Sequence, residues 1–473
     1  MKTVVLNGSP SGENSITLQT VLFLEKHFPK AKFEIINVGQ KIRHYEEDFS
    51  KAAATMEKAD LILFCYPVYT FLVPAQLHRF VELIKENHVN LQGKFATQIT
   101  TSKHFYDVTA HRFIQDNCDD LGLKYIRGLS ADMEDLLNSR GRKEALSFFR
   151  FVRWSIKNDI CEPARYSTFN GLEPTEDKEN VYENSETEAG SIKTGCGTTG
   201  DPDSSADKGP GKIVVLTDNA KRENPTLSGM IRTFTQNSPC ACDVIDLQEL
   251  GMKGGCLGCF HCASDGTCIY KDGFTDYLRN RIQTADAVVY AFTVRDHSMG
   301  SLFKMFDDRQ FCNGHRTVTM GKPVGYIISG RLHEEENLRM VLEARAEVGG
   351  NYFSGIACDE KEPEKGIWKL AKTLSYAIEN HYCPPKNFYG VGGLKIFRDL
   401  IYTMQGLMRE DHRFYKENGF YDFPQKKKLT IAGMYLVGTM MTNKKISKKI
   451  GGKMTEGMLM PYKKVLEKID NSR

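Results

Sequence analysis

The chain contains two copies of one sequence pattern, and this internal repeat constrains the fold more than any other feature. A short apolar run opens each copy, as "TVVLNGSPSGENSITL" at residues 3–18 and "KIVVLTDNAKRENPTL" at residues 212–227. Further on, residues 59–82 align without gaps with residues 285–308. The offset between the copies grows from 210 to 226, so the second copy has about sixteen extra residues between its first loop and its third strand. The repeat predicts a tandem duplication with an insertion in one copy.

Each copy alternates apolar strand runs with amphipathic helical stretches, as in "VVLNG", "FEIINV", "LILFCYPV" and "FATQITT" of the first copy. This alternation is typical of βαβ units, which form a parallel sheet covered by helices on both faces. We therefore expect an α/β protein with two doubly wound parallel sheets. Ligands of such open sheets bind beyond the carboxyl ends of the strands, so the loops there are the candidate binding sites.

Composition changes along the chain predict four regions. The segment between the copies has ten acidic and three basic residues and almost no apolar ones, which is typical of a flexible linker. Residues 426–473 carry twelve basic and three acidic side chains, and their apolar stretch at 429–441 is too short to span a membrane. We expect a helical extension that packs on the body or on a second subunit, with an interfacial helix on anionic lipid as the alternative. The predicted regions are 1–168, the acidic linker 169–210, 211–382 with the cysteine-rich insertion, and the helical basic extension 383–473.

The overall composition favours a soluble cytoplasmic protein. The 473 residues are 41% hydrophobic and carry a net charge of +3, which argues against nucleic acid as an obligate partner. The start "MKTVVLNGSP" leads directly into a strand and a loop, so we expect no secretory signal, and no apolar run is long enough for a transmembrane segment. Thirteen mostly scattered cysteines do not form the framework of a secreted disulfide-rich protein, so a reducing cytoplasm is expected.

The first loop of the first copy, "NGSPSGENSIT", follows a strand and precedes a helix. Its hydroxyl and amide side chains, together with unpaired backbone N–H groups at the helix start, suit a phosphate group. The loop lacks the glycine and lysine spacings of nucleotide-triphosphate and dinucleotide loops. A serine-rich turn that only caps the helix is the structural alternative. The candidate phosphate-binding residues are Ser9, Ser11, Asn14 and Ser15.

A second segment, "YPVYTFLVPAQLHRF", places two prolines around aromatic residues at the end of a buried strand. Together with the first loop, this segment resembles the flavodoxin-like flavin reductases, which have a G-S-P-rich loop followed by a P-x-Y and P-A-x-L-K segment. The resemblance covers most of residues 1–135 and, more loosely, 211–360. It implies that the first loop holds the phosphate of FMN. It also implies that Pro67, Val68, Tyr69, Thr101 and Ser102 border the isoalloxazine ring.

The second copy departs from this pattern at both segments. Its first loop has Asp218, Asn219 and Ala220 in place of Gly8, Ser9 and Pro10. Asp218 would repel a phosphate, whereas Lys221 and Arg222 can compensate as direct partners. A second FMN is therefore a weaker expectation than the first. Its candidate residues are Lys221, Arg222, Asn224, Thr226, Thr293 and Arg295.

The segment "GGCLGCFHCASDGTC" at residues 254–268 brings Cys256, Cys259, Cys262 and Cys268 close together in the sequence. Repeated C-x2-C steps favour a polynuclear cluster, whereas a four-cysteine zinc site usually has two such steps separated by a longer spacer. In this context the segment resembles iron–sulfur flavoproteins, which implies a [4Fe–4S] cluster on the four thiols. Free or redox-active thiols, and zinc or structural thiols, stay open as alternatives, and His261 is expected at the surface.

The leading hypothesis is an electron-transfer oxidoreductase with FMN in the first domain and a cluster in the second. The family resemblance implies NAD(P)H as the donor, with ferredoxin equally open, and a small molecule or a protein as acceptor. His104 and Tyr106 are the weak candidates for catalysis, with capping or packing as the alternative.

Because such folds pair, the duplication can imitate a dimer within one chain and bring the cysteine loop of one half to the flavin of the other. A homo-oligomer is also open. The rival functions are a metal-free flavin or quinone reductase and a non-enzymatic redox partner or sensor.

Overall fold

A computed structural model describes residues 1–164, 209–219 and 223–442, together with the single residues 459 and 467. The first half contains a sheet with the strand order β2-β1-β3-β4-β5, in which β6 also pairs with β4. All of its pairings are parallel. The strands are β1 (Lys2–Asn7), β2 (Lys32–Ile36), β3 (Leu61–Pro67), β4 (Phe95–Ser102), β5 (Lys124–Tyr125) and β6 (Leu129–Asp132).

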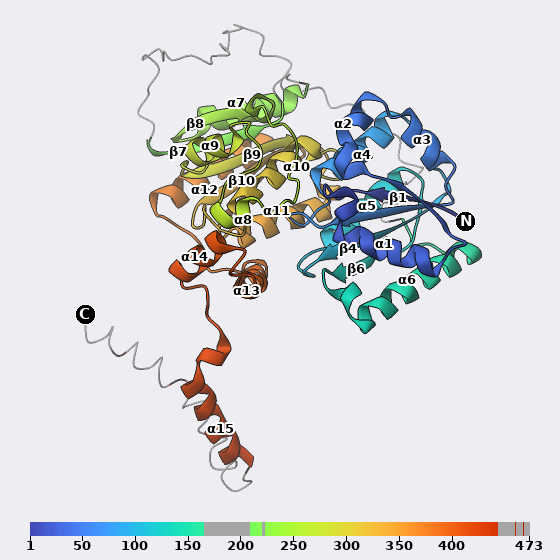
Figure 1. The fold of residues 1–473 in the computed structure, drawn as a ribbon. Coiled ribbons are helices and arrows are strands. Elements are labelled where there is room, and N and C mark those ends of the chain that lie inside the picture. Colours follow the sequence, from blue (N-terminus) through green and yellow to red (C-terminus); the bar gives the residue numbers. More distant parts are fainter. Residues whose placement is uncertain (165–208, 220–222, 443–458, 460–466, 468–473) are drawn as a thin grey trace. The chain divides into compact units, whose positions relative to one another are not determined.

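Helices cover both faces of this sheet (Figure 1). One face packs on α1 and α6 through a buried cluster that includes Val5, Leu18 and Phe149, and the other face packs mainly on α4 and α5. The helical elements are η1 (Gly12–Asn14), α1 (Ile16–His27), α2 (Val38–Glu47), α3 (Ser50–Glu57), α4 (Ala75–Glu86), α5 (Val108–Asp120), η2 (Asp135–Leu137) and α6 (Ser139–Asn158).

The second half repeats the architecture with a five-stranded parallel sheet in the order β8-β7-β9-β10-β11. Its strands are β7 (Gly209–Thr217), β8 (Cys240–Asp246), β9 (Ala287–Thr293), β10 (Pro323–Ser329) and β11 (Tyr352–Cys358). Helices α7 and α12 cover one face, and α10 and α11 cover the other. The helical elements are α7 (Pro225–Asn237), η3 (Leu247–Leu250), α8 (Cys262–Asp265), α9 (Phe274–Tyr277), η4 (Leu278–Ile282), α10 (Gly300–Arg309), η5 (Gln310–Asn313), η6 (Leu332–Glu334), α11 (Glu336–Val348) and α12 (Pro363–Glu379).

Both sheets follow the 2-1-3-4-5 strand order of doubly wound flavodoxin-like folds, so the predicted fold class is confirmed. The connection between the second and third strands runs over residues 37–60 in the first half and 247–286 in the second. The difference matches the sixteen extra residues that the repeat offset predicts. The cysteine segment lies in this longer connection, where the first half has α2.

The two halves pack on each other through equivalent helices. Helix α4 contacts α10, and α5 contacts α11, so one hydrophobic cluster continues from the first sheet into the second. Residues 1–414 accordingly form one compact unit and residues 415–473 a second. Most of the predicted linker lies outside the described residues.

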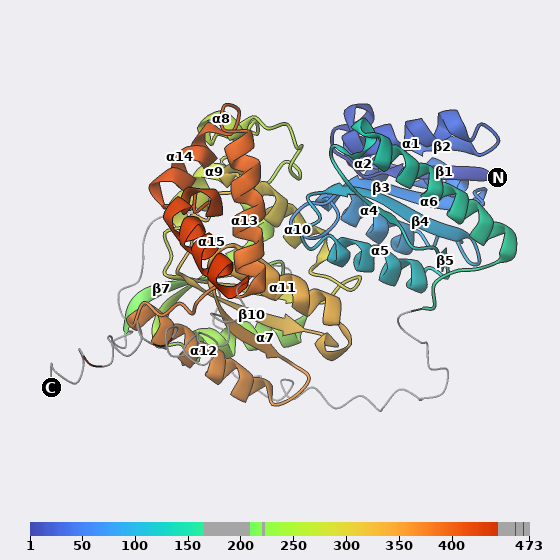
Figure 2. The same cartoon turned by 90° about the horizontal axis from the view of Figure 1, so that it is seen from below.

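Three further helices belong to the C-terminal region, namely α13 (Phe388–Thr403), α14 (Arg409–Glu417) and α15 (Lys428–Thr442), with the short η7 (Pro424–Lys426) between the last two. Helix α13 packs along α11 of the second half (Figure 2). Helix α15 belongs to the second unit, and its apolar residues Leu429, Met434 and Tyr435 are exposed. Within the described residues, no helix combines the length and the apolar character that crossing a bilayer requires.

Candidate flavin site and cysteine loop

The first candidate loop is held in place by a buried asparagine at the end of β1. The Asn7 Nδ2 group donates to the Gly12 carbonyl at 2.9 Å and to Asn37 Oδ1 at 3.0 Å, and Asn7 Oδ1 accepts from the Ser9 N–H at 3.3 Å. The loop also lies directly on α2, because a Cβ at Gly39 would be 2.3 Å from the Ser9 carbonyl carbon. The loop is therefore fixed from both sides before any ligand binds.

The four predicted phosphate-binding residues lie at the amino end of α1. The Ser9 and Ser15 side chains are buried, and Ser15 caps the helix by accepting a hydrogen bond from the Leu18 N–H at 3.4 Å. Ser11 is half-buried and Asn14 is exposed in the 3-10 turn that precedes the helix. The first-turn N–H groups of a helix of this length attract an anion. The local geometry therefore suits a phosphate group.

The loop after β3 contains a tight turn that presents Tyr69. Tyr69 and Leu72 exchange backbone hydrogen bonds of 2.8 and 3.0 Å across Thr70 and Phe71, whose φ angles are 44° and 68°. Two central residues with positive φ define the type I′ geometry. The equivalent turn of the second half, at residues 295–298, has the same geometry, with positive φ at Asp296 and His297. The repeat thus extends to the backbone conformation of the loop.

The third loop follows β4 and meets the other two at the carboxyl edge of the sheet. The Val68 N–H donates to the Thr101 carbonyl at 3.0 Å, and the hydroxyl groups of Thr101 and Thr17 are 2.6 Å apart. Ser102 Oγ donates to Asp107 Oδ2 at 2.9 Å and accepts from the His104 N–H at 2.9 Å. The structure therefore gathers the predicted segments at one edge, while their contact with FMN stays a prediction.

The two weak catalytic candidates lie in this same loop, in strained conformations. His104 and Tyr106 have φ angles of 56° and 53°, which are uncommon for residues other than glycine. The His104 ring is half exposed, and its Nδ1 lies 3.1 Å from Ser130 Oγ and 3.6 Å from Asp107 Oδ2. The Tyr106 ring packs edge-on against Tyr389 of α13, with ring centroids 4.6 Å apart. Both side chains thus make packing or polar contacts within the protein.

The cysteine loop, residues 254–268, does not form an assembled metal site. Throughout the described part of the chain, no group of three or more His, Cys, Asp or Glu residues is arranged to hold a metal ion. Cys256 Sγ accepts a hydrogen bond from the Gly258 N–H at 3.4 Å, and Cys262 Sγ donates to the Phe311 carbonyl at 3.2 Å, while Cys259 is exposed. Burial raises the pKa of the Cys256 thiol to about 12 and that of Cys262 to about 11. The four thiols therefore form no ready ligand set, although Cys256 and Cys262 both interact electrostatically with Cys259. A cluster on them stays a prediction.

A buried arginine holds the cysteine loop to α10. The Arg309 guanidinium makes two hydrogen bonds of 2.8 Å to the Asp272 carboxylate and one of 3.0 Å to the Gly254 carbonyl. It also stacks on the Tyr270 ring at 4.2 Å. His261, which the sequence places at the surface, is exposed. Cys312, which the sequence analysis did not single out, is buried near Cys262.

The cysteine loop also contacts the first half at its candidate flavin loops. A Cβ at Gly258 would be 2.2 Å from Tyr69 Oη, so only glycine fits beneath that hydroxyl group. The Gln76 Nε2 group donates to the Cys256 carbonyl at 3.3 Å, and Arg43 of α2 donates to the Lys253 carbonyl. The Tyr69 ring meets Phe311 edge-on, with centroids 5.4 Å apart. Sequence reasoning missed Gln76 and Arg43, because no local pattern indicates contacts made 180 and 210 residues away.

The equivalent first loop of the second half is occupied by its own side chains. Asn219 Nδ2 donates to the Asn224 carbonyl at 2.7 Å and to Ser228 Oγ at 2.9 Å. Asn224 Nδ2 donates to the hydroxyl groups of Thr293 and Ser329, both at 2.9 Å, and its Oδ1 caps α7. Thr226 is half-buried in the first turn of α7. Two predicted flavin contacts, Asn224 and Thr293, thus bond to each other.

Charge at this second loop also differs from that of the first. Burial raises the pKa of Asp218 to about 6, and Arg295 forms an ion pair of 3.6 Å with Glu223. The predicted phosphate partners Lys221 and Arg222 lie outside the described residues. Among the described side chains, those of the first loop of the first half therefore suit a phosphate group better, and the position of the flavin stays a prediction.

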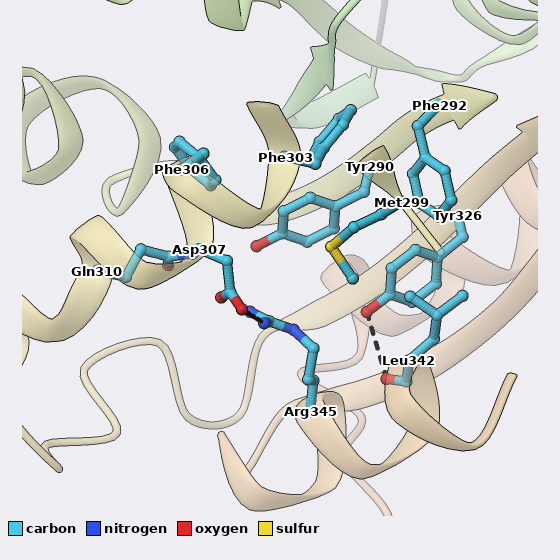
Figure 3. Close-up of a pocket in the computed structure, with 10 residues that line it drawn as sticks. All are labelled: Tyr290, Phe292, Met299, Phe303, Phe306, Asp307, Gln310, Tyr326, Leu342 and Arg345. Atoms are coloured by element: carbon cyan, nitrogen blue, oxygen red, sulfur yellow. Dashed lines mark hydrogen bonds and ion pairs between the residues drawn. The ribbon is translucent and has the colours of Figure 1, made fainter. Parts of the chain in front are cut away.

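A small internal cavity lies between the second sheet and helices α10 and α11 (Figure 3). Aromatic side chains, including Tyr290, Phe303 and Tyr326, line it together with the ion pair of Asp307 and Arg345. Tyr326 Oη donates to the Leu342 carbonyl at 3.3 Å. The free space suits about one water molecule, so the cavity is part of the core rather than a ligand site.

Two parallel sheets of this topology, with polar loops gathered at the carboxyl edge of the first, define a flavodoxin-like protein, a class that binds its ligands at that edge. The model of the family described as NADPH-dependent FMN reductase matches residues 1–113 and 212–355. Because these segments make up more than half of the chain, the chain belongs to this family and is an oxidoreductase of the flavin type. The two separate matches confirm the predicted duplication.

Two relatives share a similar level of identity with the chain. An iron–sulfur flavoprotein of Archaeoglobus fulgidus is 29% identical over 174 residues, which cover 35% of this chain and 79% of that protein. An iron–sulfur flavoprotein of Clostridioides difficile is 26% identical over 149 residues, which cover 30% of this chain and 65% of that protein. Among solved structures, an FMN-dependent NADH-azoreductase from Bacillus anthracis, in complex with FMN, is 12% identical with a TM-score of 0.26, and the match covers 32% of this chain and 98% of that one.

Proposed function

We propose that this flavin oxidoreductase binds FMN in its first half and a [4Fe–4S] cluster on the cysteine loop of its second half, and transfers electrons between a reduced donor and an acceptor. One observation carries the proposal. Tyr69, which belongs to the loop that borders the candidate flavin site, lies directly on Gly258, between Cys256 and Cys259. A flavin and a cluster bound at these two places would be neighbours across the boundary between the halves.

The residues of the first half fit the parts of FMN. Ser9, Ser11, Asn14 and Ser15 at the start of α1 would bind the phosphate, which the positive end of the helix dipole also attracts. Pro67, Val68 and Tyr69, with Thr101 and Ser102, would border the ring. Bound FMN supplies two-electron chemistry and releases electrons singly, while the protein supplies placement and electrostatic tuning.

The four thiols fit an iron–sulfur cluster by donor chemistry, because thiolates are the preferred ligands of iron in such clusters. Three glycines in the segment, Gly254, Gly258 and Gly266, have positive φ, a conformation in which other residues are strained. The printed names of the two relatives, both iron–sulfur flavoproteins, also support this assignment. A bound cluster supplies one-electron transfer.

The donor and the acceptor are further parts of the proposal. Family membership favours NAD(P)H as the donor, and ferredoxin is the alternative. The acceptor is a small molecule or a redox protein. We place the reaction in the cytoplasm, where thiols stay reduced.

A metal-free flavin reductase is the second candidate function. One observation favours it, namely that Cys256 and Cys262 bond to the protein and the four thiols form no assembled site among the described residues. In that case the cysteine loop would line one side of the flavin site without binding a metal.

Cofactor analysis after anaerobic purification tests the proposal. We expect about one FMN, about four iron and about four sulfide per chain. Cys259→Ser should lose most of the iron and keep the flavin, whereas Cys383→Ser, an exposed cysteine outside the loop, should keep both. Flavin without iron would establish the metal-free reductase. Neither flavin nor iron after reconstitution would contradict the proposal and favour a non-enzymatic redox partner.

A kinetic test addresses the donor. The holoprotein should oxidise NADPH or NADH in the presence of an electron acceptor, and the visible flavin bands should bleach when the donor is added anaerobically. Bleaching by reduced ferredoxin but not by either nucleotide would assign ferredoxin as the donor.

A further inference from the structure

Helix α13 has an unusual run of glycines for a helix that packs on the body of the protein. Gly390, Gly392 and Gly393 lie within its first six residues, and each weakens a helix relative to alanine. Asn387 compensates in part by capping the helix, since its Oδ1 accepts from the Tyr389 N–H at 2.9 Å. We therefore expect other side chains to pack closely against these glycines, in the space that a larger residue would occupy.

At Gly392 and Gly393, part of that space is filled by Phe105 of the first half. A Cβ at Gly392 would be 2.9 Å from Phe105 Cε2, and a Cβ at Gly393 would be 3.2 Å from Phe105 Cε1. The same Cβ at Gly393 would be 3.0 Å from Cγ2 of Val348 on α11. Gly392 and Gly393 thus form a notch that receives the Phe105 ring, and Phe397 on the next turn completes it with a ring centroid 6.3 Å from that of Phe105.

Phe105 is the centre of the loop of residues 102–107, which follows β4 at the candidate flavin site. Its neighbours His104 and Tyr106 both have left-handed backbone conformations, with φ of 56° and 53°. Such conformations persist only where the surroundings determine them. The contacts of Phe105 with the notch, and of Tyr106 with Tyr389 at 4.6 Å, provide these surroundings.

The loop of residues 102–107 is hydrogen-bonded to the residues that are predicted to border the flavin ring. The His104 N–H donates to Ser102 Oγ at 2.9 Å, and Ser102 follows Thr101, whose carbonyl accepts from the Val68 N–H at 3.0 Å. A displacement of Phe105 would therefore also move its neighbour His104, and through the His104 N–H hydrogen bond it would move Ser102.

We propose that α13 is a positioning element of the first-half flavin site, in which the notch of Gly392 and Gly393 holds Phe105 and so fixes loop 102–107 beside the flavin ring. The C-terminal extension of the second half thus completes the site of the first. The effect on flavin rests on the function proposed above, whereas the effect on the loop does not.

The test uses the full chain and a double-mutant cycle. Gly392→Ala should place a methyl group where the Phe105 ring lies, raise the Kd for FMN about tenfold, shift the visible absorption bands of bound flavin and speed hydrogen exchange in residues 102–107. Phe105→Ala should have similar effects. In the Phe105→Ala background, Gly392→Ala should add nothing, because the ring that the methyl group meets is absent. Gly433→Ala in α15, with open space around it, is the control for helix propensity.

The readouts separate a positioning role from a purely structural one. A structural role would change the thermal midpoint and leave the FMN Kd and the flavin spectrum unchanged, and that result would overturn the proposal. Additive effects in the double variant would also overturn it. If the wild-type chain binds no FMN, the proposed function and the flavin role of α13 fail together. Hydrogen exchange in residues 102–107 then still decides whether the notch holds the loop.

Discussion

Glu82 and Asp308 occupy equivalent positions in the two halves, and each caps a helix of the other half. The Ala75 N–H at the start of α4 donates to Asp308 Oδ2 at 2.8 Å. The Ser301 N–H and Oγ at the start of α10 donate to the Glu82 carboxylate at 2.7 and 2.6 Å. A contact made twice by equivalent residues is the arrangement of a twofold dimer interface. At the level of single residues, the duplication has therefore kept a dimer-like contact within one chain.

The surroundings of these two carboxylates differ, and this difference leads to a prediction. Asp308 is fully buried beside Lys304, which is also fully buried, and burial raises the pKa of Asp308 to about 6. Asp308→Ala leaves the Lys304 ammonium without its nearest carboxylate, so we expect the chain to lose about 3–5 kcal/mol of stability. Glu82→Ala should cost about 1.5–3 kcal/mol. Glu86→Ala, which removes a half-exposed ion pair with Arg79, should cost under about 1 kcal/mol.

Thermal unfolding of the three variants checks this order. The midpoint should fall most for Asp308→Ala and least for Glu86→Ala. Equal midpoints for the variants at Asp308 and Glu86 would contradict the assigned role of the buried pair.

At the scale of elements, helices α1 and α7 are equivalent but present different amino ends. Ser9 and Ser15 leave the start of α1 lined by small hydroxyl side chains, whereas Asn219 and Asn224 fill the start of α7 with hydrogen bonds of 2.7–2.9 Å. The raised pKa of Asp218, caused by burial, indicates a poorly solvated carboxyl group where a phosphate would bind. We infer that the two elements have diverged in ligand binding while keeping the same fold.

This divergence predicts one FMN per chain. Flavin released by denaturation should amount to about one equivalent of the protein. Ser9→Ala combined with Ser15→Ala should raise the FMN Kd about tenfold or more, since two donors to the phosphate are lost. Asn219→Ala, the matched change at α7, should leave the Kd unchanged. Two equivalents of flavin, or a loss of flavin in Asn219→Ala, would place a cofactor in the second half.

For the molecule as a whole, His297 of the second half joins the two halves by contacting one carboxylate from each, Asp120 of the first and Glu335 of the second. His297 Nε2 lies 3.1 Å from Asp120 Oδ2 on α5, and its Nδ1 lies 3.0 Å from Glu335 Oε1. Burial alone would lower the pKa of His297, but hydrogen bonds and charge from both carboxylates raise it to about 10. Lys85 also contacts Asp120, at 2.6 Å, and the pKa of Asp120 falls to about 2, because these hydrogen bonds and charges outweigh its burial.

The direction of the pH dependence follows from these shifts. Because the folded-state pKa of His297 lies above its unfolded value of about 6.5, its contribution to stability is fully present below pH 6.5. That contribution is then lost progressively as the pH rises toward about 10. His297→Gln should lower the thermal midpoint at about pH 6, corresponding to about 1.5–3 kcal/mol, and have a much smaller effect at about pH 9.5. A difference between wild type and variant that is independent of pH would contradict the charged bridge.

Much of this architecture could be predicted from residues that are close together in the sequence. The alternation of apolar runs and helical stretches predicts parallel sheets, because only buried strands tolerate continuous runs such as "LILFCYP". The change in repeat offset places the cysteine insertion between the second and third strands, where the structure has it. The three loops at the carboxyl edge of the first sheet were predictable for the same reason, since parallel strands all end at one edge.

The remaining features depend on contacts that only the folded chain makes. Tyr69 meets Gly258, Phe105 enters the notch of Gly392 and Gly393, and His297 bridges to Asp120, in each case across more than 170 residues of sequence. Two of the thiols that the sequence groups by spacing, Cys256 and Cys262, likewise bond to Gly258 and Phe311. Residues close together in the chain, and the repeat itself, are enough to predict the strands, the duplication and the polar loops, because periodicity, loop composition and repeats are read directly from the sequence. The tertiary structure decided which loops share a site, because side-chain packing between distant segments has no local pattern.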